Sequence, residues 1–238
     1  MYEDELAIFA SGGVRAVALD LMGQGNSITN NTAITIERHA DNVECVLKKL
    51  ALEDPVIIGG HYSSQLAAEL AKRQSIGASL LVIDGGVLID DLESSKLAGK
   101  TARVKPALLP QADKSHRDFL WRNAENIFDI YAPDYEITDE TSLSVYRHIK
   151  DYLAAYLQAP GASLLLPPLD YPFAETLAQL TVPAVFLTAD TETLASSVGP
   201  MSDIYGGPFS IHSFGSHHPL HFPSRKGEYA RAILSMLD

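Results

Sequence analysis

The chain has 238 residues, of which 46% are hydrophobic, and a formal net charge of −12 at pH 7. This length and apolar content are enough to bury a large core, either as one domain or as a domain that carries an insertion. The negative charge argues against nucleic acid or an anionic membrane surface as a partner, and no apolar run approaches the roughly 20 residues that span a bilayer.

The N-terminal residues and the cysteine content favour a cytoplasmic protein. Residues Met1–Glu5 are acidic and lack the basic start of a secretory signal. Cys45 is the single cysteine, so no disulfide can form within the chain. We therefore expect the protein to work in a reducing, cytoplasmic environment.

Strands and helices are expected to alternate in the first part of the chain. A strand is predicted over Arg15–Leu21 and an amphipathic helix over Ile34–Leu50. Two buried strands are predicted at Val56–Ile58 and Leu80–Ile83, on either side of a helix over Ser64–Arg73. This order is typical of a parallel sheet that is covered by helices on both faces.

Residues 88–178 interrupt this alternation. Polar helical stretches and frequent prolines predict a mostly helical insertion there. Strands are predicted again at Val182–Leu187 and Phe209–Phe214, followed by a closing helix over Arg225–Leu237. The predicted organisation is an α/β core formed by residues 1–87 and 179–238, with the insertion between them.

A sharp turn is predicted where the strand Val56–Ile58 meets the helix that follows. The turn has the sequence Gly59-Gly60-His61-Tyr62-Ser63, whose small residues tolerate a strained backbone. Such a turn lifts one side chain above the end of a parallel sheet. A gapless alignment on Gly-x-Ser-x-Gly places His61 at its centre, and a slip of one residue places Tyr62 there.

The chain resembles the α/β-hydrolase family over nearly its whole length. The resemblance is carried by the loop Asp20–Ser27, the turn and helix Val56–Ala71, the strand Thr181–Leu187 and the loop Phe214–Pro219. It implies a mostly parallel sheet with helices on both faces and a helical cap formed by the insertion. In the family, further strands and a His-Gly oxyanion loop precede the segment matched here by Tyr2–Ser27, so an N-terminally short sheet is expected.

The resemblance also assigns a nucleophile position, which departs from the family. Members carry serine, cysteine or aspartate there, whereas this chain has His61, with Tyr62 as the alternative. Ser63 and Ser64 fall where the family has glycines, and their hydroxyls are expected to cap backbone amides. His61 could act as a base or a hydrogen-bond donor, and Tyr62 could donate to a developing oxyanion.

The remaining catalytic positions are assigned in the same way. The general base falls on His217, with His218 as the alternative, and the acid falls on Glu192, with Asp190 as the alternative. The acid would hold the imidazole in one tautomer and stabilise its protonated form. Asp84 matches a second acid position of some members, although a helix cap or a loop hydrogen bond is favoured for it.

No metal or cofactor is expected. The segment Gly23-Gln24-Gly25 lacks the rest of a dinucleotide fingerprint and does not open a helix directly. The histidines His217, His218 and His221 lack a cysteine or carboxylate at ligand spacing. The chemistry is therefore expected to rest on side chains alone.

Aromatic residues of the insertion are candidates for substrate binding. They include Trp121, Phe128 and Tyr146, several of them at helical spacing. Packing between the cap and the sheet is the simpler role for most of them. Together they favour a small, largely apolar ligand over a sugar or a nucleotide.

Three functions remain open from the sequence. The first is an enzyme that acts on a small, largely apolar molecule by cofactor-independent acid–base or hydrolytic chemistry. The second is a catalytically inactive relative that binds a ligand or a partner. The third is a fragment of an ordinary esterase or lactonase. A homo-oligomer is possible in each case.

Overall fold

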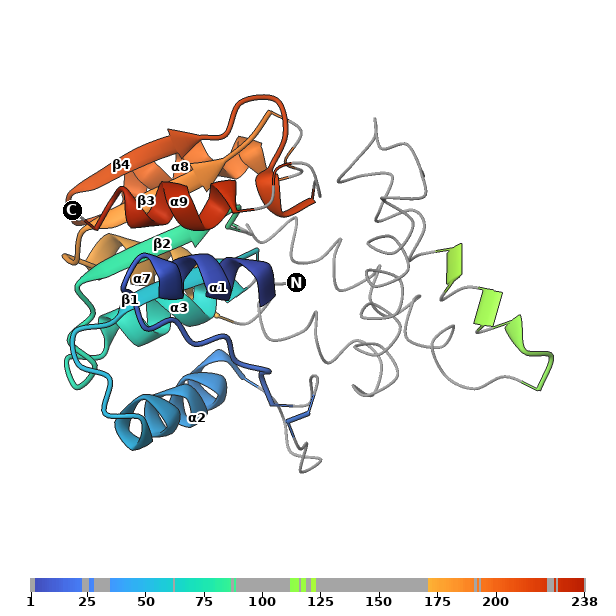
Figure 1. Cartoon of the computed structure of the whole chain (residues 1–238), viewed down its shortest axis with the longest axis horizontal. Helices are drawn as coiled ribbons and strands as arrows, with labels where there is room; N and C mark the ends of the chain where they lie inside the picture. Colours follow the sequence, from blue (N-terminus) through green and yellow to red (C-terminus); the bar gives the residue numbers. More distant parts are fainter. Residues whose placement is uncertain are drawn as a thin grey trace.

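The computed structural model describes residues 3–22, 26–27, 35–61, 63–86, 88, 112–115, 117–118, 121–122, 171–190, 192, 194–221, 225 and 227–237. In this part of the chain, helices and strands alternate around one parallel sheet (Figure 1). None of the helices described here combines the length and apolar character that a membrane span requires.

The sheet consists of strands β1 (Val56–Gly60), β2 (Leu80–Asp84), β3 (Ala184–Thr188) and β4 (Phe209–Ser213). They are parallel and lie in the order β1-β2-β3-β4, with Val82 of β2 opposite Ile58 and Val185. The two central strands are almost entirely buried, as their unbroken apolar sequences require. The carboxyl ends of all four strands therefore meet at one edge of the sheet.

Helices cover both faces of this sheet (Figure 1). One face carries α3 (Ser63–Lys72), α7 (Phe173–Gln179) and α8 (Ala195–Ile204), and α2 (Ile36–Lys49) packs on α3; the other face carries α1 (Glu3–Ser11) and α9 (Glu228–Leu234). Because strand side chains alternate, Leu81 and Ile83 pack towards α3, whereas Val82 packs with Phe9 and Tyr229. The predicted parallel sheet with helices on both faces is thus confirmed.

Polar contacts fix the starts of two helices. The hydroxyl of Thr35 accepts a hydrogen bond from the amide of Arg38 at 3.2 Å, which caps α2. The buried carboxylate of Glu5 accepts from the amides of Gly227 and Ala230 at 2.9 and 2.8 Å. Glu5 therefore ties α1 to the start of α9, where a negative charge is favourable.

The strand predicted over Arg15–Leu21 is wrong. Residues 14–21 are described and contain no strand, and the side chains of Val17 and Leu19 are 42% and 38% exposed. Among the described residues, no backbone hydrogen bond joins this segment to the sheet. An alternating apolar pattern gives a strand only where backbone hydrogen bonds join it to a neighbouring strand, and in the part of the chain that the structure describes this segment makes none with the sheet.

Most of the predicted insertion, including residues 89–111 and 123–170, lies outside the described residues. The last residues of the predicted insertion, from 171 to 178, are described. Tyr171 and the α7 residues Phe173 and Leu177 are buried in the same cluster as α3 and α8. The apolar side chains of residues 171–178 therefore pack against the sheet side of the molecule together with α3 and α8.

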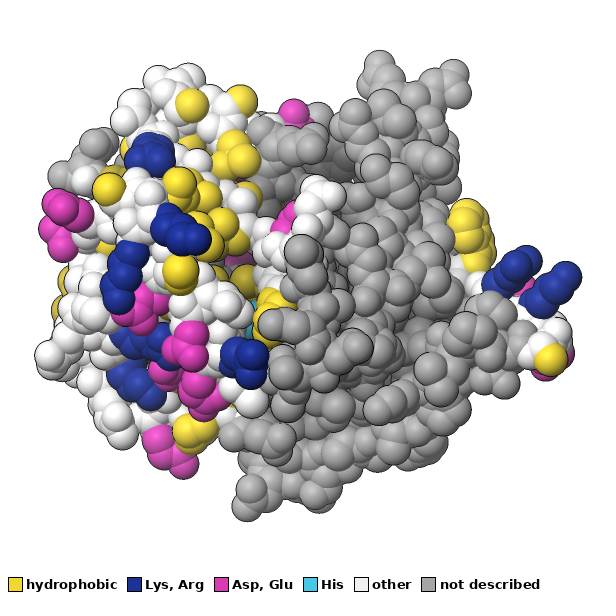
Figure 2. Space-filling view, turned by 90° about the horizontal axis from the view of Figure 1, so that it is seen from below, with side chains coloured by type: hydrophobic (Ala, Val, Ile, Leu, Met, Phe, Trp, Pro, Cys, Tyr) yellow, Lys and Arg dark blue, Asp and Glu magenta, His cyan; other side chains and the backbone are white. Residues whose placement is uncertain are grey.

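Charged side chains of both signs lie together on the surface formed by α2 and α3, and Figure 2 shows such clusters beside a group of hydrophobic side chains. Arg73 at the end of α3 contacts Asp41 and Glu44 at 2.9 Å each and Glu69 at 3.2 Å. Hydrogen bonds from Lys48, Ser75 and Arg73 lower the pKa of Glu44 to about 2. This network joins α2 to α3.

Candidate functional site

The turn after β1 holds His61 in a left-handed backbone conformation, with φ of 53°. Its amide donates to the carbonyl of Asp84 at 2.8 Å, and its carbonyl accepts from the hydroxyl of Ser64 at 2.5 Å. A Cβ on Gly59 would lie 2.3 Å from the carbonyl oxygen of Ser63, so only glycine lets α3 fold back over the strand. A side chain at positive φ is rare and strained, and such strain is found at functional sites.

His61 contacts Glu192, the residue predicted as the acid. The distance from His61 Nε2 to Glu192 Oε1 is 3.3 Å, and the two side chains are 30% and 1% exposed. Glu192 follows β3 and also accepts a hydrogen bond from the amide of Leu194 at 3.3 Å. A Cβ on Gly85 would meet both side chains at 3.4–3.5 Å, so a glycine at this position leaves room for the pair.

A second histidine–carboxylate pair lies at the end of β2. His218 Nε2 and Asp84 Oδ1 are 2.9 Å apart, and both side chains are buried. The amide of Leu220 points at His218 Nδ1 at 3.4 Å, which assigns the proton of a neutral ring to Nε2. The ring also packs against Phe214 and Tyr229, with centroids 5.2 and 5.7 Å away.

Asp84 brings the two pairs to the same edge of the sheet. Its carbonyl accepts from His61, and its carboxylate holds His218. The partly exposed imidazole of His61 is accessible to a small molecule, whereas the ring of His218 is 2% exposed. His61 with Glu192 can therefore exchange a proton with a ligand, and His218 with Asp84 can fix the loop around it.

The structure describes three of the other predicted site residues, His217, Asp190 and Trp121. His217 is partly buried, and its carbonyl accepts a hydrogen bond from the guanidinium of Arg225. Asp190 is exposed, and its amide donates to the carbonyl of Gly215 at 2.8 Å. Trp121 is 49% exposed. Three candidates, Tyr62, Phe128 and Tyr146, lie outside the described residues.

The contact of His218 with Asp84 differs from the expectation for both residues. The sequence favours His217 over His218 as the base, and it favours a cap or loop hydrogen bond for Asp84. The sequence does carry a signal, because Asp84 is a charged residue directly after the apolar run Leu80–Ile83. A carboxylate buried at such a position needs a hydrogen-bonding partner, and His218 is that partner.

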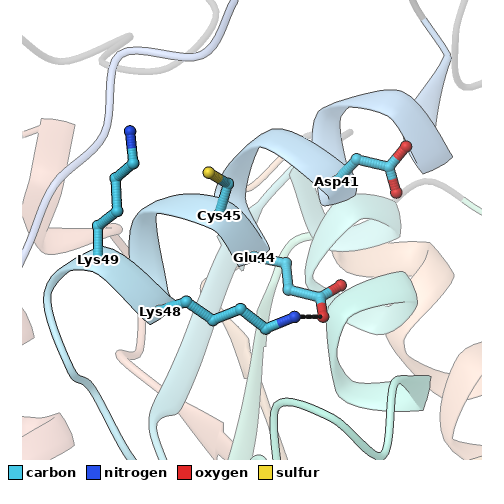
Figure 3. A pocket seen from close by; sticks show the side chains of 5 residues that line it. All are labelled: Asp41, Glu44, Cys45, Lys48 and Lys49. Carbon is cyan, nitrogen blue, oxygen red and sulfur yellow. Dashed lines mark hydrogen bonds and ion pairs between the residues drawn. The ribbon is translucent and has the colours of Figure 1, made fainter.

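A separate hollow of about 520 Å³ lies on the surface of α2 (Figure 3), lined by Asp41, Glu44, Cys45, Lys48 and Lys49. Glu44 and Lys48 pair with each other there at 2.7 Å. All of the lining residues come from one helix, so no second element converges on this hollow. Within the described residues, no group of three or more His, Cys, Asp and Glu side chains could hold a metal ion.

The sequence matches the model of the alpha/beta hydrolase family over residues 1–232. The chain therefore belongs to this family, as its parallel sheet and the turn at His61 already indicate. A comparison with curated protein sequences gives no match.

Solved structures with the same fold include MenH, an esterase and a lactonase. MenH from S. aureus has a TM-score of 0.76 at 15% identity, over 99% of this chain and 87% of that chain. An esterase from Exiguobacterium antarcticum has a TM-score of 0.68 at 14% identity, over 99% and 85%. The enol-lactonase from Burkholderia xenovorans has a TM-score of 0.72 at 13% identity, over 99% and 86%. At these identities the likeness concerns the fold alone.

Proposed function

We propose that this protein acts on a small, largely apolar organic molecule by cofactor-independent hydrolysis, with a histidine at the turn in place of a serine. The observation that carries this proposal is the contact of His61 with Glu192, 3.3 Å between Nε2 and Oε1. A buried carboxylate behind a partly exposed imidazole is the arrangement that a general base needs. The esterase and the lactonase among the structural neighbours make an ester or a lactone the first substrate class to test.

In this proposal His61 activates a water molecule. Glu192 accepts a hydrogen bond from Nε2–H of His61, so Nδ1 of the same ring removes a proton from the water. The oxygen of that water attacks the carbonyl carbon of the substrate. Nδ1 then returns that proton to the leaving alkoxide when the carbon–oxygen bond breaks. The products are a carboxylic acid and an alcohol, and no covalent enzyme intermediate forms. Tyr62 is the proposed donor to the oxyanion, and His217 is the alternative general base. Trp121, Phe128 and Tyr146 are the proposed apolar contacts.

The test is turnover of p-nitrophenyl acetate and butyrate and of a simple lactone by the parent chain and single variants. We expect His61→Ala to lower kcat/KM by about 100- to 10,000-fold, and Glu192→Gln to lower it by a smaller factor with a shifted pH profile. His212→Ala is the matched control, because His212 lies on β4, outside both histidine–carboxylate pairs. Activity that survives His61→Ala contradicts the proposal.

A second function is favoured by the absence of serine from the centre of this turn. A relative that has lost its nucleophile would keep the fold and bind a ligand without turning it over. The same assay separates the two possibilities. An inactive parent together with an active His61→Ser variant would support the binding protein, since the rest of the hydrolytic machinery would then be intact.

A further inference from the structure

The guanidinium of Arg225 holds the loop that follows β4. It donates from Nη2 to the carbonyl of Phe214 at 3.2 Å and from Nη1 to the carbonyl of His217. These carbonyls lie at the two ends of the segment Phe214–His217, so one side chain spans this part of the loop. A hydrogen bond from a charged donor is roughly twice as strong as one between neutral groups. Arg225 is therefore expected to restrict the path of the loop.

Arg225 is in turn held by α9. Its Nε and Nη2 donate to Glu228 Oε2 at 2.8 and 2.5 Å, and the hydrogen bonding from Arg225 lowers the pKa of the Glu228 carboxyl. Tyr229 and Ala230, which follow in the helix, are buried in the core. The side chains of Arg225 and Glu228 are 26% and 40% exposed, and an ion pair open to solvent adds little to stability. Its effect is therefore expected in the geometry of the loop.

The loop is hydrogen-bonded to the turn that carries Glu192. The amide of Phe214 donates to the carbonyl of Thr188 at 2.9 Å, and the amide of Asp190 donates to the carbonyl of Gly215 at 2.8 Å. Glu192 follows Asp190 by two residues. A change in the path of the loop at Gly215 would therefore be passed to the turn and to the carboxylate of Glu192.

The contact between Glu192 and His61 is sensitive to a small displacement. Its distance of 3.3 Å between Oε1 and Nε2 is already at the long end for a hydrogen bond from a ring nitrogen. A further shift of a few tenths of an ångström would take the carboxylate out of reach of the imidazole. The support behind Glu192 therefore matters for the pair.

We propose that Arg225 is a positioning residue, which keeps Glu192 within hydrogen-bonding reach of His61. This inference rests on the proposed function, in which that pair removes a proton from water. Arg225 donates to the backbone of the loop and to Glu228, so it acts on the pair through the loop and not on the substrate. Misplacement of a reacting group by about 1 Å can lower a rate about 100-fold, so a partial loss of support is expected to cost less than that.

Amide hydrogen exchange tests the positioning without any need for activity. Arg225→Met keeps the aliphatic stem but removes the donors, and we expect it to lower the protection of the Asp190 amide at least about tenfold. The Leu81 amide, which donates to Pro183 within the sheet at 2.9 Å, should change by less than about threefold. Arg38→Met, at an exposed arginine of α2, is the matched control and should change neither amide. Unchanged protection at Asp190, or an equal loss at Leu81, overturns the proposal.

A kinetic comparison with p-nitrophenyl butyrate tests whether Arg225 acts through Glu192. We expect Arg225→Met to lower kcat about tenfold with KM within about threefold of the parent, and Arg225→Lys to recover part of the loss. In a Glu192→Ala background the same change should lower kcat less than about threefold, because the group that it positions is absent. A full tenfold loss in both backgrounds contradicts the proposal.

The two experiments separate this proposal from the proposed function. An inactive parent chain would tell against the proposed function, whereas the exchange comparison would still decide whether Arg225 positions the turn that carries Glu192. An active parent with unchanged exchange at Asp190 in Arg225→Met would overturn the role of Arg225 alone.

Discussion

The carboxylate of Asp84 and the imidazole of His218 are 2.9 Å apart although 134 residues separate them in the chain. The backbone carbonyl of Asp84 also accepts a hydrogen bond from the amide of His61. One residue at the end of a central strand therefore fixes both the turn after β1 and the loop after β4. This arrangement makes the site depend on contacts that are distant in sequence, and it leads to the first prediction.

Asp84 and His218 are expected to be energetically coupled. In a double-mutant cycle of Asp84→Ala and His218→Ala, we expect each single variant to lower the free energy of unfolding by about 3 kcal/mol, since each leaves a buried polar partner behind. The double variant is expected to cost about 1.5–3 kcal/mol less than the sum of the two. Urea denaturation measures the cycle, and a coupling energy near zero would show that the contact contributes little.

The turn at His61 is expected to depend on Gly59. A Cβ there would lie 2.3 Å from the carbonyl oxygen of Ser63 and 2.7 Å from Ala67 Cβ, neither of which can move without shifting α3. We expect Gly59→Ala to lower the free energy of unfolding by at least about 2 kcal/mol and to reduce any activity of the site.

Gly199→Ala is the control for this change. Gly199 lies in α8, and a Cβ built on it meets no atom within 4 Å apart from its chain neighbours and the backbone of its own helix. Alanine is the better helix former, but Pro200 follows and disfavours a helical residue with a Cβ before it, so this variant is expected to stay within about 1 kcal/mol of the parent. Similar losses in the two variants would show that the close approach at Gly59 is not the cause.

Arg73 is expected to contribute to stability through its guanidinium geometry. It contacts Asp41, Glu44 and Glu69 and donates to the carbonyl of Glu37 at 3.1 Å, with its side chain 17% exposed. We expect Arg73→Met to lower the free energy of unfolding by about 2 kcal/mol. Arg73→Lys should lose less stability than Arg73→Met but remain less stable than the parent, because an ammonium group cannot donate to several partners in the planar arrangement of a guanidinium. Lys49→Met, at an exposed lysine of α2, is expected to stay within about 0.5 kcal/mol, and an equal effect would contradict the assignment.

The architecture was predictable because its elements carry local signals. The apolar run Leu80–Ile83 gave a buried strand, and the glycines before His61 gave the turn. Arg15–Leu21 has the same kind of apolar pattern, but a strand also needs a partner, which the sequence of the segment does not contain. The burial of Phe173 and Leu177 was not predictable for a similar reason, since only the packing shows that their side chains join the core cluster.

The site was predictable at the level of loops and not of single side chains. The resemblance assigned Glu192 to hold the imidazole of His217, and the structure shows Glu192 in contact with His61. The sequence could not choose between His217 and His218, because adjacent residues of a loop point in different directions. The direction is set by Asp84 and by the rings of Phe214 and Tyr229, which come from distant parts of the chain.

His39 is expected to make the stability of the fold depend on pH. Its side chain is buried in α2, and burial lowers its pKa from the usual 6.5. The unfolded chain therefore binds a proton more readily than the folded one, so stability is complete above about pH 6.5 and falls as the pH is lowered towards the folded pKa. In that window the slope from one such group approaches about 1.4 kcal/mol per pH unit.

The variant His39→Leu tests this contribution, because leucine cannot titrate. Among the described residues, His39 Nδ1 is buried without a hydrogen-bond partner, so its removal is also expected to leave stability at pH 7.5 unchanged or raised by about 1 kcal/mol. Urea unfolding of both proteins between pH 7.5 and 5.5 gives the two slopes. The variant should lose less stability than the parent as the pH falls, and parallel curves would show that His39 does not titrate differently in the folded and unfolded states.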